Sequence, residues 1–230
     1  MPPQSSWNAF SAFQVFGDHV PMDGFTLVVR IAADTEAVDQ LIARRAARQE
    51  VLDPELGRMM LRAGVGLVQS PASRFVYATC DEAVVVLRRE AVSDVGQSLE
   101  IHDHLVSSWA ARMALISGES VSVCGRLYEL PDLGVVRKLI RTAVDGYEDQ
   151  TPLRSARRLG AQLRGRGQPF HLSMVETIEE QTDLLEQHGI NINSLPSWWW
   201  RGVAARCNVG SGVDLFTELP GTDELISLIE

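Results

Sequence analysis

The chain has 230 residues, 45% hydrophobic and 22% charged, so it carries enough apolar surface to form a large folded core. This composition excludes an intrinsically disordered chain and is typical of one large domain of helices and strands, alone or with a small appended lobe. No run reaches the roughly 18–20 unbroken apolar residues of a membrane helix, and no basic segment followed by an apolar run opens the sequence. We therefore expect a cytoplasmic protein without membrane contact. The net charge of −9 argues against strong nonspecific binding of nucleic acid.

The N-terminal part of the chain predicts one strand and two helices. Residues 24–33 form a continuous apolar run with β-branched residues, which is typical of a strand buried on both faces. Residues 34–50 have helical periodicity, with Asp34 or Thr35 as the N-cap, and residues 53–70 predict a second helix.

A β-hairpin is the clearest single prediction. Residues 74–90 contain two β-rich arms on either side of Asp81 and Glu82. Acidic side chains are poorly suited to the centre of a strand and well suited to a turn. We therefore expect two antiparallel strands joined by a tight turn that displays this acidic pair.

The rest of the chain is expected to be mainly helical. A helix, a strand, an interrupted helical stretch and an acidic helix are predicted over residues 98–118, 119–131, 134–167 and 173–190, followed by a tail with little periodicity. The order of elements predicts an α+β fold of the polymerase-like palm type: an antiparallel sheet with a central acidic hairpin and helices on one face, plus a C-terminal helical extension. We place the palm at residues 1–133 and the helical region packed on it at residues 134–230.

The acidic turn suggests a chemistry. Nucleotidyl transfer uses carboxylates to hold Mg²⁺, which neutralises the triphosphate and activates the attacking oxygen. Asp81 and Glu82 are the candidate catalytic residues, and Asp81 is also a candidate metal ligand. A two-metal site needs a second acidic segment, for which Asp34 and Glu36 are available, although both could simply begin the helix. The alternative is an exposed turn that binds nothing.

Three other clusters have alternative interpretations. His102 and His104 could ligate a metal on a strand, but residues two apart on the expected helix point away from each other, so histidines facing solvent or an anion are favoured. Three consecutive tryptophans, Trp198 to Trp200, could stack bases, but such clusters more often close a core or an oligomer interface. The last cluster is either an ordinary solvated helix face or a phosphate- or partner-binding patch, and consists of Arg154, Arg157, Arg158, Arg164 and Arg166.

Several segments, taken together in order and spacing, resemble the tRNA-histidine guanylyltransferase family over roughly residues 10–205. The resemblance covers the first strand, the acidic hairpin, the later strand and two C-terminal segments. These are VVRI (28–31), FVYATCDEAVVVLR (75–88), CGRLYELP (124–131), EEQTDLLEQHGIN (179–191) and LPSWWWRG (195–202).

The resemblance implies a palm enzyme that adds guanylate to, or repairs, tRNA 5′ ends, with two Mg²⁺ ions, bound ATP or GTP, and a homo-oligomer, a dimer or tetramer. Where the family has its first metal-binding aspartate this chain has Ala32-Ala33, and one family lysine aligns with Glu180. The family's triphosphate-binding cations align with Glu100, Ile101, His102 and His104, and an aspartate is replaced by Cys124 while Arg126 is kept.

Asp34, His102, His104 and Arg126 are thus the candidate nucleotide-binding residues, and Asp81 and Asp34 the candidate metal ligands. Three hypotheses remain open. The first is a divergent nucleotidyltransferase that uses a purine nucleoside triphosphate and Mg²⁺; tRNA as its acceptor is disfavoured by the net charge of −9. The second is an inactive or repurposed scaffold for nucleotides or proteins. The third is an enzyme of other chemistry that uses His102, His104 and Asp81 in one cleft.

Overall fold

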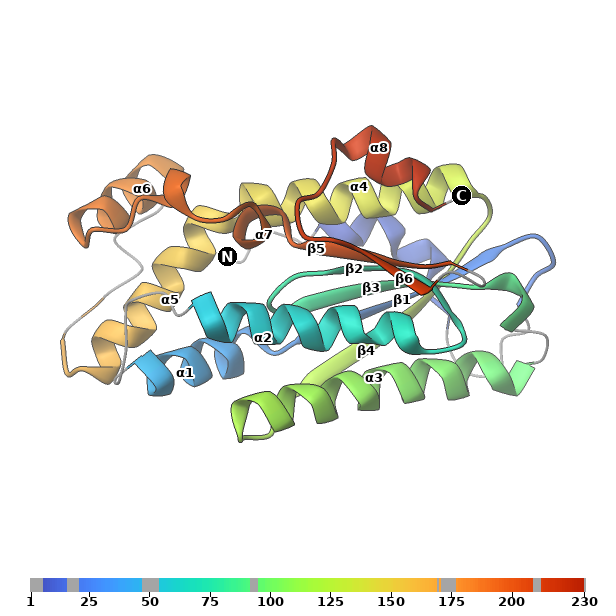
Figure 1. Ribbon diagram of the computed structural model, residues 1–230, viewed down its shortest axis with the longest axis horizontal. Helices are drawn as coiled ribbons and strands as arrows, with labels where there is room; N and C mark the ends of the chain where they lie inside the picture. Colours follow the sequence, from blue (N-terminus) through green and yellow to red (C-terminus); the bar gives the residue numbers. More distant parts are fainter. Residues whose placement is uncertain are drawn as a thin grey trace.

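The computed structural model describes residues 6–15, 21–46, 54–91, 95–168, 170, 177–208 and 212–229. The centre of the structure is one six-stranded sheet with strand order β4-β1-β3-β2-β5-β6 (Figure 1). Every pair of neighbouring strands is antiparallel. The strands are β1 (Thr26–Ala33), β2 (Ser73–Ala78), β3 (Glu82–Leu87), β4 (Val123–Leu130), β5 (Val203–Asn208) and β6 (Gly212–Phe216). The expected α+β palm with its central hairpin is confirmed.

Eight α-helices and four short 3-10 helices lie in the described ranges. The α-helices are α1 (Thr35–Ala46), α2 (Pro54–Val65), α3 (Val95–Ser117), α4 (Leu133–Asp149), α5 (Thr151–Gly165), α6 (Ile178–Gln187), α7 (Ser197–Arg201) and α8 (Thr222–Ser227). The 3-10 helices are η1 (Ser6–Phe13), η2 (Gly66–Gln69), η3 (Arg89–Ala91) and η5 (Ile192–Ser194). None of the helices in these ranges combines the length and apolar character needed to cross a bilayer.

Helices cover both faces of the sheet, which corrects the expectation of helices on one face. Along β1, Val29 and Ile31 belong to a core shared with α1, α2 and α3, whereas Val28 belongs to a second core shared with η1, α4 and α8. Successive side chains of a strand point to opposite faces, so the two cores lie on opposite sides of the sheet. Val28, Val29 and Ile31 are all fully buried, which explains the unbroken apolar run in the sequence.

The C-terminal tail contains two strands that the sequence pattern did not predict. β5 pairs with β2, and β6 pairs with β5 at the edge of the sheet. Ala204 and Ala205 are both fully buried, so β5 lacks the alternation by which a half-exposed strand is recognised. The division at residue 133 remains a prediction, but the part after it is not purely helical.

Two glycines let helices approach the sheet closely. A Cβ at Gly64 of α2 would lie 2.7 Å from Cβ of Ala78, the last residue of β2. A Cβ at Gly125 of β4 would lie 2.3 Å from Val106 and 2.5 Å from His102, both on α3. Larger residues at either position would push the helix away from the sheet that carries the acidic turn.

Candidate nucleotide site at the acidic turn

The turn between β2 and β3 holds Asp81 in a fixed position. The Thr79 hydroxyl accepts a hydrogen bond from the Glu82 amide at 3.0 Å and lies 3.1 Å from Asp81 Oδ1. The Asp81 carbonyl accepts from the Ala33 amide of β1 at 2.8 Å. Asp81 is half-buried and forms an ion pair with no basic side chain of the described residues, so its carboxylate is available to a ligand.

Glu82 differs from Asp81 in both position and partner. It is the first residue of β3, and its two carboxylate oxygens accept from Arg30 Nε at 2.9 Å and Nη2 at 2.8 Å. This bidentate geometry is the strong form of an arginine–carboxylate pair. Burial acts to lower the pKa of Arg30, but the charge and hydrogen bonds of Glu82, with smaller contributions from Tyr128 and Cys124, raise it above its ordinary value. The predicted catalytic pair is therefore divided into Glu82, which is ion-paired, and Asp81, which accepts a hydrogen bond from Thr79 but forms no ion pair with a described residue.

We expect Glu82→Gln to reduce stability without abolishing ligand binding. Loss of the carboxylate leaves the charge of Arg30 partly buried, with side-chain exposure of 16%, which should lower the free energy of unfolding by about 1–3 kcal/mol. Urea denaturation measures the change, and Glu100→Gln at an exposed position of α3 is the matched control. A variant of unchanged stability that no longer binds nucleotide would assign Glu82 to the site instead.

Asp34, the predicted second metal ligand, caps a helix. Its Oδ1 accepts from the Ala37 amide at 2.8 Å, which confirms the expected N-cap of α1. Asp39, five residues further along the chain on α1, has a pKa that burial raises, with a smaller contribution from the negative charge of Asp81. Asp39 was missed because it lies in the helix interior, beyond the strand end at which palm carboxylates are expected.

Helix α5 brings an arginine to Asp39. Arg157 Nε lies 3.4 Å from Asp39 Oδ2, and helices α1 and α5 pack together over an extended contact. Burial raises the pKa of Asp39, and the nearby Arg157 and Arg158 partly offset that increase. The Asp39 carboxylate is thus a counter-ion for α5.

Arg158 is the unusual member of the cluster, because it is 3% exposed. No described residue forms a hydrogen bond or an ion pair with its guanidinium, which lies 5.2 Å from the ring centre of Trp199. Burial acts to lower its pKa, but the neighbouring Cys80, Tyr147 and Asp81 raise it, so the group stays charged. The solvated-face interpretation of the arginine cluster is wrong for Arg158, whereas Arg164 and Arg166 are exposed as that interpretation expects.

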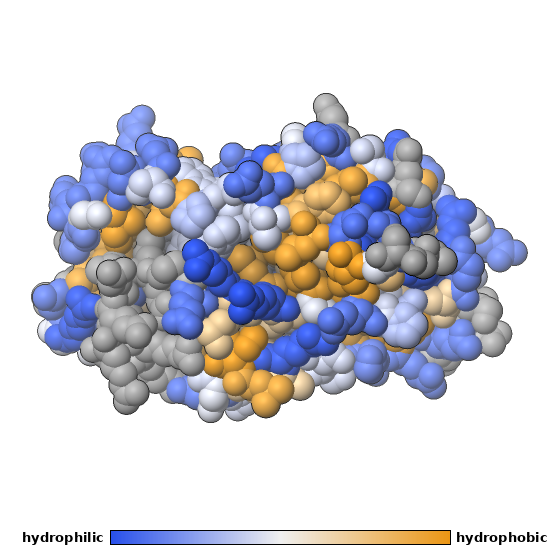
Figure 2. Space-filling model, viewed as in Figure 1, coloured by the Kyte–Doolittle hydropathy of each residue, from blue (hydrophilic) through white to orange (hydrophobic). Residues whose placement is uncertain are grey.

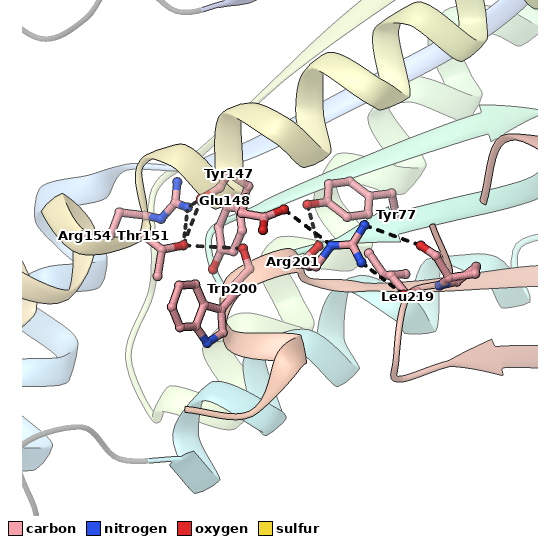
Figure 3. Close-up of polar contacts among 9 residues, drawn as sticks. Tyr77, Tyr147, Glu148, Thr151, Arg154, Trp200, Arg201 and Leu219 are labelled. Atoms are coloured by element: carbon pink, nitrogen blue, oxygen red, sulfur yellow. Dashed lines mark hydrogen bonds and ion pairs between the residues drawn. The ribbon is translucent and has the colours of Figure 1, made fainter. Parts of the chain in front are cut away.

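A polar network fixes the start of α5 against α7 (Figure 3). Arg154 donates to the Tyr147 carbonyl and, at 3.3 Å, to the Thr151 hydroxyl, and its guanidinium stacks 3.5 Å from the centre of the Tyr147 ring. The Thr151 hydroxyl donates to the Tyr147 carbonyl at 2.9 Å and lies 3.4 Å from the Trp200 carbonyl oxygen. Arg154 is therefore used for structure and not for ligand binding.

The same network joins α4 to the sheet through Arg201 (Figure 3). Its guanidinium lies 3.5 Å from the Glu148 carboxylate and donates to the Leu219 carbonyl at 3.2 Å, while its own carbonyl accepts from the Tyr77 hydroxyl at 2.8 Å. Tyr77 lies on β2, three residues before Cys80 and four before Asp81. The position of α5 relative to the acidic turn is thus set by contacts between segments distant in sequence.

The remaining predicted residues are not gathered at Asp81. His104 lines a separate pocket together with Arg88, which follows the last residue of β3, whereas Asp81 precedes its first. Six residues of strand span about 20 Å, so the third hypothesis, with both histidines and Asp81 in one cleft, is not supported for His104. His102 packs over Gly125 with Nδ1 2.9 Å from Asp103, and Arg126 is exposed on β4 opposite Arg30.

Among the described residues, no three or more His, Cys, Asp or Glu side chains form a cluster that could hold a metal ion. Of the expected carboxylates, Glu82 pairs with Arg30 and Asp34 caps α1, and the additional carboxylate of Asp39 pairs with Arg157. The residues present therefore do not fit a two-metal site. They fit a single Mg²⁺ that arrives with a triphosphate, because Mg²⁺ is usually held by one or two carboxylates plus phosphate oxygens and water.

An antiparallel sheet with an acidic hairpin turn and an arginine-bearing helix packed beside it defines a palm-type fold. Comparison with solved structures identifies which one. The chain is similar to a bacterial tRNA(His) guanylyltransferase (Thg1)-like protein in complex with ATP, at 14% identity and TM-score 0.69, covering 97% of this chain and 95% of that one. It is also similar to such a protein in complex with GTP, at 14% identity and TM-score 0.65, covering 96% and 94%.

A third similar structure is the tRNA(His) guanylyltransferase from Saccharomyces cerevisiae, at 14% identity and TM-score 0.58, covering 91% of this chain and 96% of that one. No sequence-family model and no curated protein matches the chain. The chain thus has the fold of the Thg1-like tRNA(His) guanylyltransferases, and the resemblance drawn from the sequence motifs is confirmed at the level of the fold.

Proposed function

We propose that this protein binds a purine nucleoside triphosphate, ATP or GTP, between the Asp81 turn and helix α5. The buried guanidinium of Arg158 carries the proposal, since it is a charged donor with no hydrogen-bond partner among the described residues. Burial of such a charge costs free energy unless a nearby opposite charge compensates it. A triphosphate supplies that charge, and two similar structures are described in complex with ATP and with GTP.

Asp81 is the second residue of the proposed site and would bind the metal ion of the nucleotide. Its free carboxylate, half-buried on a rigid turn, is suited to a Mg²⁺ ion bound to the triphosphate. The ion would screen the repulsion between Asp81 and the phosphates. Arg158 would bind phosphate oxygens from the opposite side of the site.

Binding without nucleotidyl transfer is the function that this geometry supports best. Transfer by a palm requires carboxylates from two segments, and here the second segment offers Ala32 and Ala33 at the strand end and a helix-capping Asp34. Nucleotidyl transfer is the second candidate, favoured by the free carboxylate of Asp81. The net charge of −9 disfavours tRNA as the acceptor, because the protein and the phosphate backbone would repel each other. A cytoplasmic homo-oligomer, a dimer or tetramer, remains a prediction.

Calorimetric titration with GTP and ATP, with and without Mg²⁺, tests the proposal. We expect Mg²⁺-dependent binding by the native protein and its loss in Asp81→Asn, with Asp145→Asn, at an exposed site on α4, as the matched control. If neither nucleotide binds in the presence of Mg²⁺, the proposal is wrong. Release of pyrophosphate when a 5′-phosphorylated RNA is added would establish the second candidate, transfer.

Removal of Asp39 should strengthen this binding. Asp39 and a triphosphate compete for Arg157, so Asp39→Asn frees a cation and removes a negative charge that repels phosphate. We expect the dissociation constant for GTP to fall roughly two- to five-fold, because this change in affinity corresponds to the free energy of a partly exposed ion pair. The same titration measures it, with Asp103→Asn as the control for loss of a carboxylate elsewhere. Weaker binding by Asp39→Asn would instead make Asp39 a ligand of the nucleotide or its metal.

A further inference from the structure

A second cavity, of about 380 Å³, lies on the α1–α3 side of the sheet, between α2, α7, β5 and β6. Its apolar walls include Leu61 and Val65 of α2 and Leu215 of β6. Figure 2 shows a hydrophobic surface over β5 and β6 with hydrophilic residues along the neighbouring α2. A cavity of this size is at the small end of the range for ligand pockets.

Two arginines border the cavity. Arg58 and Arg62 are exposed, and neither forms an ion pair with an acidic side chain of the described residues. Residues four apart on a helix lie about 5–6 Å from each other on the same face. In a chain of net charge −9 they form a local positive site that a single dianionic group can bridge.

An aromatic surface adjoins these arginines. Trp198 is half-buried at the cavity wall, and the Arg58 guanidinium lies 5.8 Å from the centre of its ring. Trp199 packs edge-on against Trp198 at 5.5 Å and holds the ring in place. A fixed indole bordering an open, apolar cavity is suited to stacking with a planar ring.

We propose that this cavity binds an aromatic phosphate monoester, specifically a nucleoside 5′-monophosphate, either free or as the 5′-phosphorylated end of an RNA. The base would stack on Trp198 among apolar walls. The phosphate, with a charge of about −1.5 to −2, would take hydrogen bonds from both Arg58 and Arg62. A carboxylate of charge −1 would match two guanidinium groups less well.

The cavity is distinct from the triphosphate site but close to it. Gly57 of α2 lies between them, because its carbonyl lies 3.9 Å from Cys80 Sγ while a Cβ on it would lie 3.1 Å from Trp198. Cys80 immediately precedes Asp81. The two sites therefore lie on either side of one helix turn, and occupancy of each can be measured separately.

Titration of AMP in the presence of saturating GTP and Mg²⁺ tests the proposal, since GTP fills the Asp81 site. We expect AMP still to bind the native protein. In Arg58→Glu and in Arg62→Glu the affinity for AMP should fall roughly ten-fold or more, because each variant loses one charged hydrogen bond to the phosphate. Lys138→Glu, on an exposed position of α4, makes the same change of charge and should bind AMP normally. Adenosine and inorganic phosphate should each bind more weakly than AMP.

AMP binding that disappears with GTP present, or that Arg62→Glu leaves unchanged, overturns the proposal, as does the absence of any AMP binding with or without GTP. A change in oligomeric state on Arg62→Glu with unaltered AMP affinity overturns it in favour of a self-association surface. A short 5′-phosphorylated RNA in place of AMP separates the two sources: tighter binding than AMP identifies an RNA end, and weaker binding a free nucleotide. If GTP alone does not bind, the function proposed above is wrong, but the titration with AMP still tests the proposal for this cavity.

Discussion

Arg158→Met should weaken nucleoside triphosphate binding roughly 10- to 100-fold while the protein stays folded. The guanidinium is 3% exposed and has no hydrogen-bond partner among the described residues, so its donors are free for phosphate. Charged hydrogen bonds contribute about 1.5–3 kcal/mol, and each 1.4 kcal/mol changes affinity ten-fold. Methionine keeps the apolar stem of the side chain and removes the guanidinium group that lies over Trp199. Calorimetry with GTP and Mg²⁺ measures the change.

The effect on stability separates a binding role from a structural one. Removing a buried charge that lacks a direct partner should alter the free energy of unfolding by no more than about 1–2 kcal/mol, because the desolvation cost of the charge is removed as well. Arg141→Met, exposed on α4, provides the same loss of charge and should leave GTP binding unchanged. A large drop in melting temperature with normal GTP affinity would show that Arg158 only supports the packing of α5.

Trp109→Ala should be among the most destabilising single substitutions. Trp109 on α3 is fully buried in the core that α1, α2 and α3 form on the sheet. Removing a buried aromatic side chain of this size costs about 3–5 kcal/mol through lost burial and the cavity that remains. That loss is a large fraction of the free energy of unfolding of a typical protein, which is roughly 5–15 kcal/mol, so the variant should unfold at a markedly lower urea concentration.

Leu115→Ala is the matched control, because Leu115 lies on the same helix and is 85% exposed. We expect that substitution to change stability by less than about 0.5 kcal/mol. Equal losses in the two variants would mean that α3 does not pack on the sheet through Trp109. The Trp109 indole nitrogen is buried without a partner among the described residues, so Trp109→Phe should lose less than the alanine variant.

Local chemistry was sufficient to predict several elements. The acidic residues after an apolar arm predicted the hairpin turn, and the Asp34 side chain caps α1 as expected. The interruption expected in the helical stretch of residues 134–167 is present, since α4 ends at Asp149 and α5 begins at Thr151. Such features depend on residues within a few positions of one another, so a single sequence carries their signal.

The sequence by itself therefore determined the hairpin with its acidic turn and the order of the palm elements. Only the tertiary structure decided which carboxylates and cations share the site. The pairing of Glu82 with Arg30, the pairing of Asp39 with Arg157 and the burial of Arg158 each join segments far apart in the chain. Arginine on a helix is usually solvated, and its burial here follows from packing of α5 against α1 and α7, which local periodicity does not encode.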